Sequence, residues 1–130
     1  MENKKNDITF EHKQEFHKHF IYAMLNQKKI GYAWFTIDHK DAFLSYITVN
    51  KKYRHCHVGS ALLDCVEIIC RNHRVDRIEG KFYPEIDGKI VREFYEKNGY
   101  THYREDYEQY IGKAFYRTKN LPKQEIIEKE

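Results

Sequence analysis

The stretch YRHCHVGSALL, residues 53–63, could bind a phosphate group. It stands between a strand-like segment and a helix-like segment. A helix that begins after such a loop presents unpaired N–H groups and the positive end of its dipole to an anion. Gly59 would let a phosphate approach the backbone, and Lys51, Lys52 and Arg54 add positive charge. The loop therefore predicts an anion site, although a single glycine between a strand and a helix has many other uses.

Two other groups of residues could carry chemistry, and we expect neither to do so. Cys56 has a histidine on either side, but no orienting partner or oxyanion site accompanies it, as a nucleophile would need. The segment EHKQEFHKHF holds His12, His17 and His19, of which the last two are predicted to share one strand face. No cysteine or acidic residue stands at a ligand-like spacing from them, so we expect no metal site.

Length and composition indicate one globular domain over residues 1–118, followed by a charged tail over residues 119–130. The chain has 130 residues, which suffices for one hydrophobic core, and its net charge of +3 is too small to indicate a nucleic-acid partner. No segment approaches the roughly 18 apolar residues of a membrane span, and the N-terminus lacks the apolar core of a signal peptide. Three cysteines without a CxxC pair fit a reduced, cytoplasmic protein.

The residues before the loop are predicted to form strands. They are rich in aromatic and β-branched side chains at short, regular spacing, which indicates an antiparallel meander. A turn is expected over residues 13–15, leaving no room for a helix between the first two strands. The predicted strands are residues 8–12, 16–25, 30–38 and 42–49.

After the loop the pattern changes to helical spacing. Val58, Leu62, Val66 and Ile69 form the apolar face of an amphipathic helix. The predicted exposed face comprises Ser60, Asp64, Glu67 and Arg71. A strand over residues 77–82 follows, and it can lie parallel to the fourth strand because a helix connects them. A second helix is expected between an N-cap at Asp87 and a left-handed cap at Gly99, with last strands at residues 100–104 and 111–118.

Two motifs resemble those of the GNAT acyltransferase superfamily. The stretch ITVNKKYRHCHVGSALL resembles its acetyl-CoA loop, in which [Q/R]-x-x-G-x-[G/A] follows a strand that ends in Val. The stretch EFYEKNGY, residues 93–100, resembles its second hallmark, a helix ending in FYEKxGF or similar. The resemblance covers roughly residues 42–103. It implies an α+β (mixed α/β) GNAT-like fold with two main helices and a mostly antiparallel sheet, splayed in a V between the fourth and fifth strands.

The resemblance also implies a site for acetyl-CoA as co-substrate, with no metal. The backbone of Ile47, Thr48 and Val49 would pair with the pantetheine arm. The loop that would wrap the pyrophosphate comprises Arg54, His55, Cys56, His57, Val58, Gly59, Ser60 and Ala61.

Tyr95 matches the position at which many members of the superfamily place the acid that protonates the departing CoA thiolate. A phenol with a pKa near 10 is a suitable donor to a thiolate of similar basicity. The alternative is that Tyr95 is only an aromatic residue that packs its helix against the sheet.

Three features depart from the superfamily pattern. His57 stands at the first glycine of the loop motif, where it could point into solvent, contact the phosphate or impair its binding; histidine tolerates a positive φ better than most residues. Gly88 replaces an asparagine that often contacts the cofactor. The helices that usually follow the first strand are missing, which suggests an open acceptor site, a large acceptor such as a protein, or a wall supplied by a second subunit.

The base that takes the proton of the acceptor amine is less defined. Glu79 on the fifth strand is our candidate, with Glu85 as the alternative, since a carboxylate in a cleft can act directly or through a water. Ser45 and Tyr46 on the fourth strand are expected on opposite faces, so that one of them could face the acyl group. A chain of waters with no single base is equally consistent with the sequence.

The resemblance implies an N-acetyltransferase that acts on a primary amine of a small molecule or a protein. Direct attack in a ternary complex is expected, without a covalent enzyme intermediate. Two rivals stay open: a non-catalytic CoA-binding or protein-interaction module, and an effector that acts on one protein partner. Small members of the superfamily often pair, so a homodimer is one expected state. The sequence identifies neither the acceptor nor the preferred acyl chain.

Overall fold

Residues 7–83, 88–105 and 108–115 are described by the structure, a computed structural model of the chain. Four strands come first, and a 3-10 turn at Lys51–Tyr53 follows them. The strands and helices are β1 (Thr9–Glu15), β2 (Lys18–Leu25), β3 (Lys28–Asp38), β4 (Asp41–Val49), α1 (Val58–Asn72), β5 (Arg77–Phe82), α2 (Gly88–Lys97), β6 (Thr101–Glu105) and β7 (Glu108–Ala114).

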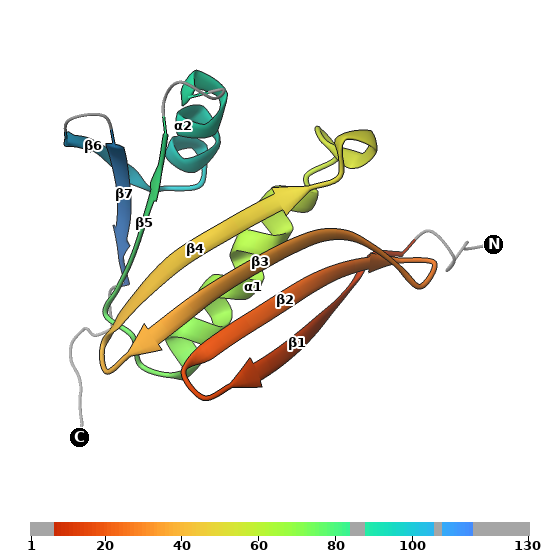
Figure 1. The fold of residues 1–130 in the computed structure, drawn as a ribbon, viewed down its shortest axis with the longest axis horizontal. Helices are drawn as coiled ribbons and strands as arrows, with labels where there is room; N and C mark the ends of the chain where they lie inside the picture. Colours follow the sequence, from red (N-terminus) through yellow and green to blue (C-terminus); the bar gives the residue numbers. More distant parts are fainter. Residues whose placement is uncertain (1–6, 84–87, 106–107, 116–130) are drawn as a thin grey trace.

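All the strands belong to one seven-stranded sheet in the order β1-β2-β3-β4-β5-β7-β6. Every neighbouring pair is antiparallel except β4 and β5, which run parallel because α1 connects them. These two strands pair only between residues 41–44 and 77–80, and then they diverge (Figure 1). The predicted α+β fold and its V-shaped splay between the fourth and fifth strands are therefore confirmed.

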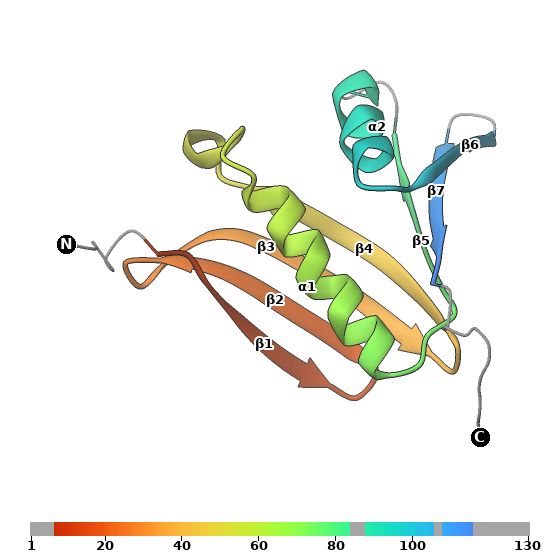
Figure 2. The same cartoon turned by 180° about the vertical axis from the view of Figure 1, so that it is seen from behind.

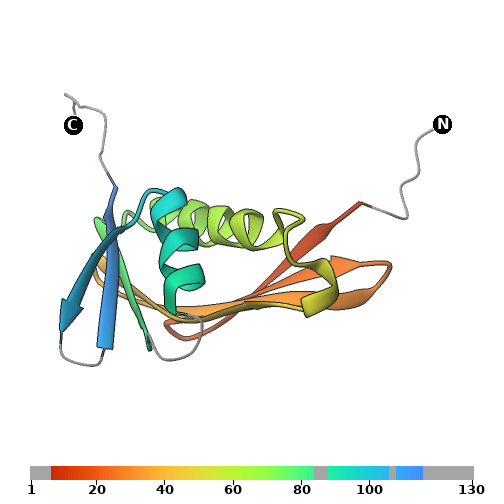
Figure 3. The same cartoon turned by 90° about the horizontal axis from the view of Figure 1, so that it is seen from above.

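Both helices lie on the same face of the sheet. Seen from behind, α1 crosses the strands of the meander (Figure 2), and α2 stands beside it over the splay (Figure 3). The apolar face of α1 is buried, with Leu62, Leu63 and Val66 fully enclosed in the main core. Among the described residues, neither helix is long and apolar enough to cross a membrane.

The first hairpin differs from the prediction. The turn lies at Phe16 and His17 rather than at residues 13–15, and β1 continues to Glu15. Phe16 adopts a φ of 58° and is 90% exposed, which sequence rules do not anticipate for an aromatic residue. His17 thus lies in a turn. The prediction that it shares a strand face with His19 is wrong. The absence of a helix between the first two strands is confirmed.

Smaller boundary corrections concern the last strands. β6 begins one residue later than expected, at Thr101, and β7 begins at Glu108 rather than at residue 111. The end of the expected last strand, the predicted cap at Asp87 and the charged tail lie outside the described residues. The expected cap at Gly99 is confirmed, since its φ is 90°.

Glu67 is the clearest error in the predicted helix pattern. We expected it on the solvent face of α1, but it is only 4% exposed. Its carboxylate accepts hydrogen bonds from the Tyr100 hydroxyl at 2.8 Å and from Lys113 Nζ at 2.9 Å. The helical pattern predicted that Glu67 is exposed because it is charged. Its burial depends on Tyr100 and Lys113, which lie far away in the sequence.

A cluster of three histidines closes the core between β1, β2 and the end of α1. His19 is 1% exposed, and its Nδ1 lies 2.9 Å from Nε2 of His12. The His19 ring also stacks on Phe35 and meets the edge of the His73 ring, each at a centroid distance of 5.1 Å. Burial, followed by the charges of His12 and His73, lowers the pKa of His19 to about 4.

This cluster predicts acid-sensitive stability. His19 titrates near its ordinary pKa of about 6.5 in the unfolded chain but only near 4 in the folded one, so the unfolded state binds more protons between these values. The free energy of unfolding should therefore be fully retained above pH 6.5 and fall by about 2–3 kcal/mol as the pH drops to 4. Urea unfolding at several pH values measures this, and His19→Phe should flatten the slope. His17→Phe, an exposed change nearby, should leave it unaltered, and an unchanged slope in His19→Phe would contradict the assignment.

Candidate functional site

The loop between β4 and α1 has the geometry of an anion site. His55 and His57 adopt φ angles of 67° and 65°, so the loop turns sharply before α1 begins at Val58. No acidic residue stands in the first turn of α1, and the His57 side chain makes no capping hydrogen bond. The N–H groups at this helix end are thus open to an anion. His57 thus adopts the positive φ that histidine tolerates better than most residues.

Arg54 holds the loop against the strand that precedes it. Its Nε donates a hydrogen bond of 2.9 Å to the carbonyl oxygen of Val49. The side chains of Arg54, His55, Cys56 and His57 are exposed, whereas Val58 is buried. The predicted binding loop is therefore fixed at its base by Arg54 and is accessible along its rim.

Gly59 brings the two helices together. A Cβ at this position would lie 3.1 Å from Cε1 of Phe94 and 3.7 Å from Cγ2 of Val49. Phe94 belongs to α2, so this glycine lets the start of α1 approach α2 beside the splay. The residue thus has a packing role in addition to the phosphate access expected from the sequence.

A side chain at position 59 is expected to force these elements apart. Gly59→Val should lower the free energy of unfolding by about 1–3 kcal/mol, because it overpacks the contact with Phe94. Asp64→Val, at an exposed position of the same helix, is the matched control and should change stability by less than about 0.5 kcal/mol. Equal stability of the two variants in urea unfolding would show that the contact tolerates the added volume.

The edge of β4 that faces the splay is open from Ser45 onward. Ile47, Thr48 and Val49 pair with β3 on their other side, and β5 pairs with β4 only as far as Leu44. A β-bulge in β4 accompanies the start of this open edge, since Trp34 pairs with Tyr46 and Phe35 with Leu44. Ser45 and Tyr46 are both exposed. Among the described residues, no strand occupies this edge, which leaves backbone groups for an extended ligand.

Tyr95 lies in α2 beside the end of β5. It is 6% exposed, and its ring packs against Phe82, Phe94 and Tyr100 at centroid distances of 6.3, 5.2 and 5.5 Å. Within the described part of the chain its hydroxyl has no hydrogen-bond partner, in contrast to that of Tyr100. Burial raises the pKa of Tyr95 well above its usual value, so the phenol keeps its proton but is a weaker acid than the match with the thiolate assumed.

Glu79 and Tyr95 are not brought together. The buried residues of β5, among them Ile78 and Phe82, face the helices, and Glu79 alternates to the other face of the sheet. Its Oε2 accepts hydrogen bonds from Arg77 Nε at 2.9 Å and from the Tyr103 hydroxyl at 3.1 Å. The bond from Arg77 lowers the pKa of Glu79, which makes it a weak base. Glu85 lies outside the described residues.

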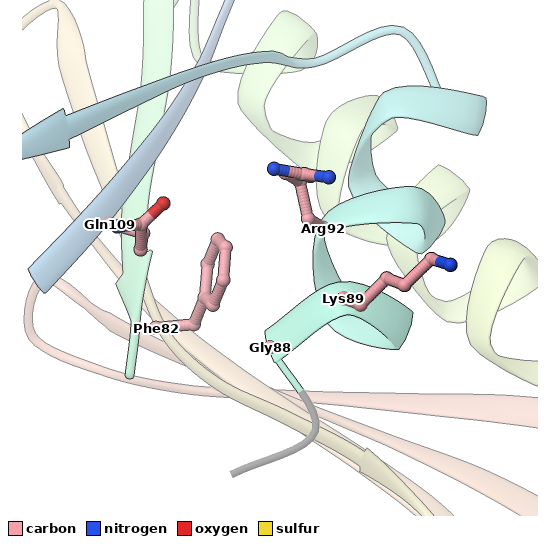
Figure 4. Close-up of a pocket in the computed structure, with 5 residues that line it drawn as sticks. All are labelled: Phe82, Gly88, Lys89, Arg92 and Gln109. Carbon is pink, nitrogen blue, oxygen red and sulfur yellow. The ribbon is translucent and has the colours of Figure 1, made fainter. Parts of the chain in front are cut away.

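One pocket was not anticipated from the sequence. It has a volume of about 210 Å³ and lies between α2 and the strands β5 and β7, next to the splay (Figure 4). Arg92, one helical turn before Tyr95, was not considered in the sequence analysis. We call this cavity the α2 pocket; it is lined by Phe82, Gly88, Lys89, Arg92 and Gln109.

Neither a metal centre nor an activated thiol is found among the described residues. In the part of the chain that the structure describes, no group of three or more His, Cys, Asp or Glu side chains is arranged to hold a metal ion. All three cysteines are free, and Cys56 is exposed. Burial raises the pKa of the Cys70 thiol to about 12, as befits a small residue of the core.

Comparisons with known proteins agree with this geometry. The family model for the acetyltransferase (GNAT) family matches residues 2–100. No curated protein matches the sequence significantly.

Similar solved structures share the fold at low sequence identity. The PaiA N-acetyltransferase from Thermoplasma acidophilum, in complex with coenzyme A, is 20% identical with a TM-score of 0.71; the match covers 76% of this chain and 62% of that one. A putative streptothricin acetyltransferase from Bacillus anthracis, in complex with acetyl-CoA, is 21% identical with a TM-score of 0.68, covering 77% and 64%. An acetyltransferase from Streptococcus agalactiae is 22% identical with a TM-score of 0.68, covering 76% and 68%. The chain thus spans less than two thirds of the length of the first two.

Proposed function

The chain belongs to the acetyltransferase (GNAT) family, and from this premise we propose that it transfers the acetyl group of acetyl-CoA to a primary amine of a small molecule or a protein. The observation that carries the proposal is the junction of three features at one place. The open α1 N-terminus, the unpaired edge of β4 and the buried phenol of Tyr95 all border the splay between β4 and β5.

The proposed binding mode uses the backbone more than side chains. The pyrophosphate would lie on the loop from Arg54 to Ala61, where helix N–H groups and the positive dipole end favour an anion. The pantetheine arm would extend along Ile47, Thr48 and Val49 as an added strand, since its amides can pair with the open edge. Two solved structures with the same fold contain coenzyme A or acetyl-CoA, which supports this mode.

The proposed reaction is a direct transfer. The neutral amine of the acceptor attacks the thioester carbonyl, a C–N bond forms, and the C–S bond breaks as the tetrahedral intermediate collapses. The thiolate takes the proton of the Tyr95 hydroxyl, and the amine nitrogen releases its proton to a base or to water. Tyr95 regains a proton from solvent, so that one thiol and one amide are the products.

Glu79 is poorly placed to act as the base. Glu79 would have to act through the splay from the far face of the sheet, and its pKa is lowered by Arg77. We therefore expect Glu79→Gln to reduce kcat/KM by less than about tenfold, as when water accepts the proton. Steady-state kinetics would measure this, with Glu108→Gln as a control for loss of an exposed ion pair. A loss of about 100-fold or more in Glu79→Gln alone would assign the base role to Glu79.

Calorimetric titration with acetyl-CoA tests the proposed donor site. Saturable binding by the native chain, together with CoA release in the presence of an amine, is the expected result. Binding by His57→Gly but not by the native chain would mean that the imidazole closes the loop, and a non-catalytic module would then be the better description. Binding without turnover of any amine or protein would favour the same module, and no binding by either chain would overturn the proposal.

A further inference from the structure

The α2 pocket contains an unusual excess of hydrogen-bond donors. Arg92 extends from α2 on the side where Phe82 and Gln109 lie, whereas the ammonium group of Lys89 points away from them (Figure 4). No acidic side chain lines the pocket among the described residues, and none stands in the first turn of α2. Among the described residues the lining thus offers hydrogen-bond donors and no carboxylate, which suits an anion.

Arg92 supplies the strongest sign of a missing partner. Its Nε is completely buried and has no hydrogen-bond partner within the described residues. A buried donor without a partner loses its hydrogen bonds to water without replacement, so native proteins rarely leave one unless a ligand or water satisfies it. Arginine is also the side chain best shaped to hold a carboxylate or a phosphate through two parallel hydrogen bonds.

Gln109 and Gly88 line the same pocket and carry further donors. Gln109 is 6% exposed, and its Oε1 is bonded to His102 Nε2, which leaves its NH₂ group available to a ligand. The first N–H groups of α2, beginning at Gly88, have no partner within the helix and lie at the pocket wall. Gly88 lacks a side chain, so a ligand can approach this backbone closely.

The position of the pocket relates it to the reaction site. Phe82 lines the pocket and also stacks against Tyr95, at a centroid distance of 6.3 Å. Arg92 precedes Tyr95 by one helical turn, or about 4.5 Å along the helix axis. A small molecule with an acidic group held by Arg92 could thus place its amine near the thioester beside Tyr95.

We propose that the α2 pocket binds an anionic group, a carboxylate or a phosphate, of the amine acceptor. This inference rests on the proposed acetyltransferase function. The acceptor would then be a small amine that carries an acidic group. A pocket for simple polyamines would require acidic residues instead.

The first arm of the test measures anion binding without catalysis. Inorganic phosphate and acetate are titrated separately into ¹⁵N-labelled protein at constant ionic strength, against chloride. We expect saturable shifts of the Gly88 and Lys89 amides and of the Gln109 side-chain NH₂. Arg92→Met should weaken this binding at least about tenfold, and Arg104→Met, an identical change at an exposed position of β6, should not. Shifts confined to residues 59–61, or unaltered in Arg92→Met, would overturn the inference.

The second arm uses matched acceptors with acetyl-CoA. The pairs are 4-aminobutyrate against butylamine, and phosphoethanolamine against ethanolamine, which also separates a carboxylate from a phosphate. We expect kcat/KM to favour the acidic member of one pair at least about tenfold, and Arg92→Met but not Arg104→Met to remove that preference. Acetylation of both members at equal rates would overturn the inference and keep the acetyltransferase.

The two proposals fail in different ways. If no amine is acetylated but phosphate or acetate binds at Gly88 and Gln109, the proposed function fails and the anion site stands. If Arg92→Met does not fold, the titration of the native chain decides alone: the absence of saturable shifts at Gly88, Lys89 and Gln109 would overturn the inference.

Discussion

Replacing Tyr95 by phenylalanine is expected to lower kcat by about 100-fold or more and to leave the affinity for acetyl-CoA nearly unchanged. The phenol is the proposed donor of the proton that the CoA thiolate takes, and phenylalanine fills the same space without that proton. The hydroxyl has no hydrogen-bond partner among the described residues, so its removal breaks no hydrogen bond within that part of the chain. Steady-state kinetics and calorimetric titration with acetyl-CoA would measure the two quantities separately.

Tyr100→Phe is the matched control for this variant. Tyr100 is equally buried, packs against Tyr95 at 5.5 Å and donates its hydroxyl proton to Glu67. Its removal should lower the free energy of unfolding by about 1 kcal/mol or more and leave kcat nearly unaltered. The opposite pattern would be a stable Tyr100→Phe variant with low kcat and a fully active Tyr95→Phe variant. It would show that Tyr95 is not the proton donor.

The pH profile gives a second test of Tyr95. Because burial raises its pKa, the phenol stays protonated over the whole range in which the folded chain can be assayed. The rate should therefore not fall at alkaline pH through loss of this proton. A fall in kcat near pH 10 that Tyr95→Phe abolishes would show that the hydroxyl is exposed to solvent during turnover.

The order of the elements was predictable because each depends on local signals. Val58, Leu62 and Val66 repeat at helical spacing, and Gly99 marks a helix end by its tolerance of positive φ. The parallel pairing of β4 and β5 follows from the connecting helix. The first hairpin was misplaced because its turn uses Phe16 at positive φ, where no glycine or asparagine announces it.

The site could be predicted from the sequence only where backbone groups form it. The loop from Arg54 to Ala61 and the edge of β4 follow from the motif and the strand order. Glu79 is separated from Tyr95 because Tyr95 packs on one face of the sheet and the Glu79 side chain lies on the other. The ion pair with Arg77 further holds Glu79 on that face. The donors of the α2 pocket come from α2 and β7, so no sequence spacing reveals that Arg92 and Gln109 converge.

Sequence spacing also fails to reveal the partners of Glu67. Removing one of these partners is expected to cause the largest loss of stability. The buried carboxylate of Glu67 is held by Lys113 Nζ at 2.9 Å and by Tyr100, with Arg71 farther away at 3.7 Å. Lys113→Met leaves this charge buried without its main cation. We expect the free energy of unfolding to fall by about 3 kcal/mol, since breaking one half of a buried ion pair is far more damaging than replacing both.

Lys81→Met provides the control, because Lys81 makes an ion pair of similar length, 2.8 Å, with Glu108 at a more exposed site. That variant should lose less than about 1 kcal/mol in urea unfolding. The double variant Glu67→Leu with Lys113→Met should recover most of the loss, since no unpaired charge then remains. A Lys113→Met protein as stable as Lys81→Met would mean that Arg71 or water compensates Glu67.

The consequence of this ion pair reaches the proposed reaction site through the backbone. Lys113 Nζ also donates to the carbonyl of Asn98, and the Tyr100 N–H donates to the carbonyl of Tyr95, so α1, β7 and the end of α2 are fastened together at Glu67. A charge read as solvent-exposed from its helical position instead fixes the helix that carries Tyr95 and Arg92. Lys113→Met should therefore lower kcat as well as stability. The double variant, which removes both charges, should regain most of the stability, and it should regain kcat only as far as α2 returns to its position.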